Sequence, residues 1–235
     1  MRSSKWHAHG NVYLLVEPER GADRLTADRA RELSAAGETD GVLEVLATDG
    51  SAAEIAVWNP DGSRAEVSGN GTRIAARWLA DRSGAREVEI RVGERVTTAR
   101  VADRLIEQDL GPVEVGARER LEGVEFVPVS VGNPHAVIEG DPAEIERIGP
   151  LLERHPRFPE RTNVQVARVD KPGRVTARVW ERGVGETRSS GTSAVAVAAA
   201  THGAGEVVVS FVGGELKVRL EAGRAHVTGP AERLE

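Results

Sequence analysis

The chain has 235 residues, 40% hydrophobic and 29% charged, with a formal net charge of −6. That composition is typical of a folded globular protein, and its acidic balance argues against nucleic acid or anionic lipid as a partner, because both require a basic surface. The absence of cysteine excludes disulfides, thiolate metal sites and thiol nucleophiles.

No apolar run approaches the roughly 18 residues that a membrane span needs, and the N-terminus lacks the apolar stretch of a secretory signal. We therefore expect a cytoplasmic protein without a membrane or nucleic-acid partner. A small molecule is the expected ligand.

Helical periodicity marks residues 26–36, 72–82, 142–155 and 192–202. Short segments rich in β-branched residues predict strands at 54–58, 88–92, 96–101, 124–131, 163–169, 175–180, 207–212 and 216–220. Between 192 and 201, small apolar residues cover every helix face, so we expect protein to enclose this helix completely. The helix after residue 72 is more amphipathic and should be less enclosed. The pattern predicts an α/β (α+β) fold in which strands dominate.

Short pieces of the first half recur in the second half, displaced by 122 residues. The pairs are Gly10 and Gly132, Asn11 and Asn133, Trp58 and Trp180, Ser68 and Ser190, and Gly69 and Gly191. A tryptophan pair in register with polar pairs is a strong sign of duplication, since the chain has only four tryptophans. We expect two similar domains, residues 1–116 and 117–235, with a strand at 225–235 packing back onto the first.

In each half, a strand ending in tryptophan is followed by a glycine-bearing loop and by Ser-Gly at a helix start. The residues at these starts are Ser68, Gly69 and Asn70 in the first half, and Ser190, Gly191 and Thr192 in the second. Free backbone N–H groups and the positive end of the helix dipole favour a bound carboxylate or phosphate. Serine is also a preferred N-cap residue, so both serines could be ordinary helix caps.

Further polar residues accompany these helix starts: Asn11, Asn59, Asn133, Asn163, Glu181 and Arg182. Each asparagine alone is typical of a turn. Together they supply amide donors and acceptors, and the arginine can bind a carboxylate through two hydrogen bonds. The set suits an amino-acid-binding site.

These motifs resemble the diaminopimelate epimerase family along nearly the whole chain. The matching stretches are KWHAHGN, NPDGSRAEVSGNGTR, VGNPHAV, RTNVQV, WERGVGETRSSGTSA and VTGPAE. The resemblance implies two pseudo-symmetric domains, each a curled β-sheet or barrel around a central helix, with the active site in the cleft between them and usually a homodimer. It also implies a cofactor-independent isomerase that converts LL- to meso-diaminopimelate in lysine biosynthesis.

In that family, one cysteine removes the α-proton and a second delivers a proton from the opposite face. Ser68 and Ser190 stand at these two catalytic positions here. The resemblance assigns substrate binding to Asn11, Asn59, Asn133, Asn163, Glu181 and Arg182, and carboxylate binding to Gly69, Asn70, Gly191 and Thr192.

The double serine should impair this chemistry. A thiol has a pKa near 8.5, whereas the pKa of a serine hydroxyl lies far higher, near that of water, a gap of roughly 7 units or ~10 kcal/mol. The positive end of a helix dipole stabilises a nearby negative charge by at most ~2 kcal/mol, which is far less than this gap.

Two alternatives stay open. The chain could be a non-catalytic amino-acid-binding homologue, or an enzyme of the proline racemase and isomerase superfamily in which His9, His135 or His7 helps to transfer protons. Each histidine could equally be a structural hydrogen-bonding residue. We expect no metal, because His7 and His9 lack a clustered carboxylate partner and the other histidines are scattered.

Overall fold

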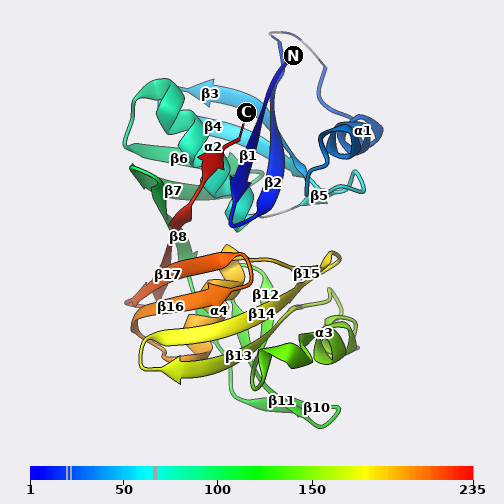
Figure 1. The fold of residues 1–235 in the computed structure, drawn as a ribbon, viewed down its shortest axis with the longest axis vertical. Coiled ribbons are helices and arrows are strands. Elements are labelled where there is room, and N and C mark those ends of the chain that lie inside the picture. Colours follow the sequence, from blue (N-terminus) through cyan, green and yellow to red (C-terminus); the bar gives the residue numbers. More distant parts are fainter. Residues whose placement is uncertain (20, 22, 66–67, 235) are drawn as a thin grey trace. The chain divides into compact units, whose positions relative to one another are not determined.

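The computed structural model describes residues 1–19, 21, 23–65 and 68–234. The chain forms two compact units (Figure 1). Unit 1 comprises Met1–Gln108 and Gly229–Glu235, and unit 2 comprises Asp109–Thr228. The chain leaves unit 1 within strand β8 (Leu105–Pro112) and returns within β18 (Arg224–Pro230). The C-terminal segment therefore belongs to the same unit as the N-terminus.

Unit 1 is a mixed sheet with two helices. Its other elements are β1 (Arg2–Ala8), β2 (Asn11–Glu17), α1 (Ala27–Gly37), β3 (Val42–Asp49), β4 (Ala52–Trp58), β5 (Arg64–Ala65), α2 (Gly69–Ser83), β6 (Glu87–Val92), β7 (Arg95–Ala102) and β19 (Glu232–Arg233). The pairs β1–β2, β3–β4, β6–β7 and β7–β8 are antiparallel, whereas β2–β3 and β4–β6 are parallel. Strand β19 pairs with β1.

Unit 2 repeats this ladder. Its other elements are β9 (Glu114–Val115), β10 (Glu119–Leu121), β11 (Val124–Ser130), β12 (Pro134–Glu139), the 3-10 helix η1 (Pro142–Glu144), α3 (Ile145–Glu153), β13 (Asn163–Lys171), β14 (Arg174–Glu181), β15 (Gly185–Thr187), α4 (Gly191–Thr201), β16 (Gly205–Phe211) and β17 (Gly214–Glu221). Pairs β12–β13 and β14–β16 are parallel, and β11–β12, β13–β14, β16–β17 and β17–β18 are antiparallel.

Strand register confirms the two pseudo-symmetric domains. Val42 pairs with Trp58 in unit 1, and the residues 122 positions later, Val164 and Trp180, pair in unit 2. The offset changes after the central helix, because α2 has 15 residues and α4 only 11. As a result, β16 begins 118 residues after β6.

Each unit curls its sheet around one helix, as the curled-sheet prediction required. In unit 2, residues 194–199 of α4 form one core with side chains from eight strands, among them Val129, Val179, Val209 and Val218. Every residue of α4 from Gly191 to Ala199 is buried. The corresponding helix α2 exposes Asp81 and Arg82 at its end, which confirms its predicted lesser enclosure. No helix in the described part of the chain is long and apolar enough to cross a membrane.

The second helix of each unit packs against the outer face of the sheet. Helix α3 buries Ile145, Ile148 and Leu152 against Val164 and Val166 of β13. All four predicted helices are present, and the predicted strands coincide with strands of the structure.

Gly149 of α3 lies directly against the Trp180 ring. A Cβ at this position would lie 2.7 Å from Trp180 Cβ, so one of the two elements must move. We expect Gly149→Ala to lower the free energy of unfolding by about 1–3 kcal/mol through overpacking. Gly140→Ala is the control, since its Cβ would meet Val166 at an ordinary 3.7 Å. Equal urea midpoints for the two variants would contradict the packing argument.

Candidate active site

Ser68 is the N-cap of α2. Its Oγ accepts a hydrogen bond from Gly71 N at 2.9 Å and lies 3.1 Å from the Tyr13 hydroxyl. A Cβ on residue 71 would lie 3.1 Å from Ser68 Oγ, so glycine lets the first helical turn approach the serine closely. Ser68 can therefore be a helix cap or a catalytic residue, because its hydroxyl caps the helix and also contacts the Tyr13 hydroxyl.

A buried cation lies one turn further along α2. Arg73 is fully buried and donates from Nη2 to Asn70 Oδ1. Burial lowers the pKa of Arg73 to about 10, so the guanidinium is still charged at neutral pH. Its charge adds to the positive potential of the helix start, where Gly69 and Asn70 lie.

Asn11 and Asn59 belong to the same unit as Ser68. His9 and Gly10 both have positive φ, 51° and 82°, and form the two-residue hairpin turn between β1 and β2. Asn11 is the first residue of β2 and is buried. Asn59 follows β4, and its Nδ2 donates to Ser63 Oγ at 2.9 Å. The backbone role of His9 is thus established, while its predicted role as a proton-transfer helper stays a prediction.

Ser190 is the N-cap of α4 but does not cap the helix with its side chain. Its side chain instead hydrogen-bonds to Glu181, the last residue of β14, and Thr187 donates a further hydrogen bond to Glu181 Oε1. Burial raises the pKa of Glu181, and the two donated hydrogen bonds oppose this effect. The structure therefore brings a predicted catalytic residue together with a carboxyl group that protonates more readily than usual.

His135 lies in a buried hydrogen-bond chain. Its Nε2 lies 3.0 Å from Asn133 Oδ1, and its Nδ1 lies 3.1 Å from Gln165 Nε2, which also donates to Ser193 Oγ of α4. Burial lowers the pKa of His135 to about 3; the Arg182 charge acts in the same direction and the hydrogen bond with Gln165 against it. The ring is therefore neutral at neutral pH, with both nitrogens occupied by amides.

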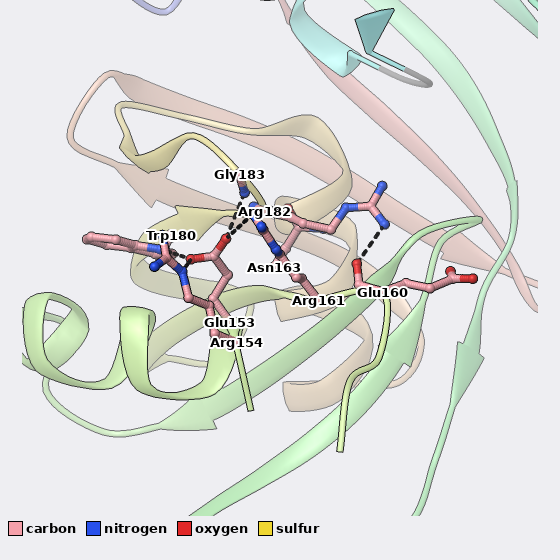
Figure 2. A network of polar contacts seen from close by, with 8 residues as sticks. All are labelled: Glu153, Arg154, Glu160, Arg161, Asn163, Trp180, Arg182 and Gly183. Carbon is pink, nitrogen blue, oxygen red and sulfur yellow. Dashed lines mark hydrogen bonds and ion pairs between the residues drawn. The ribbon is translucent and has the colours of Figure 1, made fainter. Parts of the chain in front are cut away.

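The side chain of Asn163 binds the backbone of Arg182. Asn163 Oδ1 accepts from Arg182 N at 3.0 Å, and its Nδ2 donates to Pro134 O at 2.9 Å. Figure 2 shows the Arg182 side chain extending toward Glu160, whose carbonyl oxygen accepts from Arg182 Nη1 at 3.3 Å. Asn163 thus connects the first residue of β12 to the segment after β14.

Three residues near these groups were not predicted from the sequence: Tyr13, Arg73 and Glu153. Tyr13 is the only tyrosine in the chain, which is a signal that could have been used, whereas Arg73 is one of three arginines in its helix and carried none. Glu153 stands in a charged helix end and carried none.

The fold and the two helix starts at Ser68 and Ser190 define a class: duplicated α/β proteins of the epimerase and racemase fold. A predicted epimerase from Pseudomonas aeruginosa superposes with a TM-score of 0.72 at 17% identity, over 100% of this chain and 97% of that one. A hydroxyproline epimerase from Agrobacterium vitis gives 0.66 at 18% identity, over 98% and 88%. At these identities the likeness concerns the fold alone.

Sequence comparison identifies the family. The family model described as diaminopimelate epimerase matches residues 3–115 and 127–234. A diaminopimelate epimerase of Desulfitobacterium hafniense is 34% identical over 98% of this chain and 95% of its own length, and one of Xanthomonas axonopodis pv. citri is 35% identical over 98% and 93%. The chain belongs to the diaminopimelate epimerase family.

The contact between Ser190 and Glu181 predicts an asymmetric response to loss of each serine. Ser190→Ala removes a hydrogen bond that lowers the pKa of Glu181, so that pKa should rise further, whereas Ser68→Ala should leave it unchanged. Carbon-13 NMR titration of the glutamate carboxyls measures both. An unchanged Glu181 titration in Ser190→Ala would contradict the contact.

His135 should make the protein sensitive to acid. Because its folded pKa of about 3 lies below the ordinary 6.5, the unfolded chain binds the extra proton first, and stability present above pH 6.5 is lost as the pH falls toward 3. The contribution is ~1.4 kcal/mol per pH unit within this window. The free energy of unfolding, measured in urea, should therefore fall less steeply between pH 7 and pH 4 for His135→Gln than for the unmodified chain. Parallel curves would show that His135 does not titrate differently on unfolding.

Proposed function

We propose that this chain binds diaminopimelate and inverts its α-carbon without a cofactor, at a rate far below that of a two-thiol site because Ser68 and Ser190 occupy the proton-transfer positions. One observation carries the proposal: in a chain of this family, the two serines are the N-caps of the two repeat-related central helices, α2 and α4. The close relatives that are named diaminopimelate epimerase support the choice of substrate.

The chain has groups suited to binding an amino acid with two carboxylates. The N-terminal turn of each central helix, α2 in unit 1 and α4 in unit 2, carries N–H groups that favour a bound carboxylate, and the buried charge of Arg73 strengthens the first of them. Arg182, held through its backbone N by Asn163, would pair with the second carboxylate of the substrate. Asn11, Asn59 and Asn133 complete the proposed binding set.

The groups for moving the proton are weak. Ser190 touches Glu181, whose raised pKa makes it a better proton acceptor than an ordinary glutamate, and Ser68 touches the Tyr13 phenol. Neither neighbour can bring the pKa of a serine hydroxyl, a far weaker acid than a thiol, close to the ~8.5 of a thiol. Residual exchange would depend on these two neighbours.

A second candidate function is amino-acid binding without turnover. The absence of cysteine from the entire chain favours it, because no thiol elsewhere in the sequence could take over from the two serines. A third candidate, proline racemase or isomerase chemistry, predicts exchange with hydroxyprolines instead of diaminopimelate. A homodimer located in the cytoplasm is part of the leading proposal.

The decisive test is deuterium incorporation at the α-carbon of LL- and meso-diaminopimelate in heavy water. We expect Ser68→Cys/Ser190→Cys, kept reduced, to exchange faster than the serine chain by on the order of 10²–10⁴. Mass spectrometry of the recovered amino acid measures the rate.

The control is Ser68→Ala/Ser190→Ala, which has no hydroxyl at either position. Exchange by the serine chain above this control supports slow epimerisation, whereas equal rates with intact binding support the binding-only function. No exchange by the double-cysteine variant would contradict the family reaction for this pocket.

A further inference from the structure

Glu153 is a buried carboxylate whose two oxygens hold two different groups of one segment. It is the last residue of α3 and is 2% exposed. Its Oε2 accepts from Trp180 Nε1 at 3.1 Å, and its Oε1 accepts from Gly183 N at 2.8 Å (Figure 2). The carboxylate therefore fixes residues 180–183 at both ends.

The same residue also holds the segment that precedes β13. Arg161 Nη1 lies 3.7 Å from Oε1, and the Glu153 carbonyl accepts from Thr162 N at 3.3 Å. Arg154 Nε lies 3.6 Å from Oε2. Two cations thus balance the buried negative charge, which would otherwise be costly.

These two segments carry Asn163 and Arg182, which bond to each other. Figure 2 shows the Arg182 side chain extending away from the Glu153 carboxylate, so Glu153 acts on the backbone beneath the guanidinium and not on the guanidinium itself. Loss of the bond to Gly183 would free the residue immediately after Arg182.

Unit 1 contains a comparable buried glutamate, Glu44, which does not hold a segment next to Arg182. Glu44, 1% exposed, accepts from Trp58 Nε1 at 3.1 Å, and its other oxygen accepts from Leu25 N at 2.9 Å. Trp58 and Trp180 are repeat partners, but Leu25 precedes α1 and adjoins none of the predicted site residues. The tryptophan–glutamate bond is shared, and the second bond differs.

We propose that Glu153 is a positioning residue: it holds residues 180–183 in place and thereby directs Arg182 toward a carboxylate of the substrate. The second half of this statement rests on the proposed function. Glutamine at position 153 would retain only one acceptor oxygen, so Trp180 Nε1 or Gly183 N must lose its partner, and the charge facing Arg161 disappears.

The experiment compares E153Q with E44Q. Amide hydrogen exchange, which needs no ligand, should show at least tenfold lower protection of Arg182 and Gly183 in E153Q and unchanged protection there in E44Q. E153D, which keeps the charge and both oxygens, should recover part of the protection. Equal protection of residues 182–183 in E153Q and E44Q would overturn the proposal.

Calorimetric affinities for meso-diaminopimelate and for lysine, which lacks the second carboxylate, test the consequence for Arg182. The ratio of the two affinities should fall at least fivefold in E153Q and not in E44Q, and E153Q/R182M should bind diaminopimelate no more weakly than R182M alone. Additive losses in the double variant would contradict action through Arg182. If the unmodified chain binds no diaminopimelate, the proposed function fails, and the exchange comparison alone decides whether Glu153 holds the segment.

Discussion

The first turn of a helix carries N–H groups without partners inside the helix, and in both units of this protein that turn belongs to a helix enclosed by a curled sheet. Water cannot freely satisfy groups in such a position, so the surrounding loops must provide polar partners. The polar clusters around Ser68 and Ser190 follow from this requirement. Two helix starts of this kind therefore favour carboxylate binding, whichever reaction the protein catalyses.

The two units satisfy the requirement with different chemistry. In unit 1 the serine caps its helix through Gly71 N, and a fully buried guanidinium lies one turn away. In unit 2 the serine hydroxyl is turned to Glu181, a carboxyl group whose pKa is raised by burial. The duplicated backbone has therefore diverged at its helix starts, with a cation in one unit and a carboxyl group in the other.

Local signals in the sequence were sufficient for the helices, many of the strands and the 122-residue repeat, because periodicity and repetition need no knowledge of distant partners. Partner choice was not accessible in this way. Glu153 is followed by Arg154 and His155 and has the appearance of an exposed helix end, yet its side chain turns inward to groups 27 and 30 residues away. The two buried glutamates do not follow the repeat offset, although their tryptophans do, so the repeat could not reveal them.

Replacement of a thiol by serine separates two properties that one residue combines in a two-thiol site. Serine is a strong helix cap, worth about 1 kcal/mol at a position such as Ser68, so the helix start retains its geometry. In the proposed function, binding of a carboxylate would depend on backbone N–H groups and on the charges of Arg73 and Arg182, none of which is the residue that differs. Proton abstraction depends instead on the pKa of a single atom, and there the replacement costs roughly 7 units. If the proposed function holds, this chain therefore loses most of its turnover while the groups proposed to recognise the substrate stay in place.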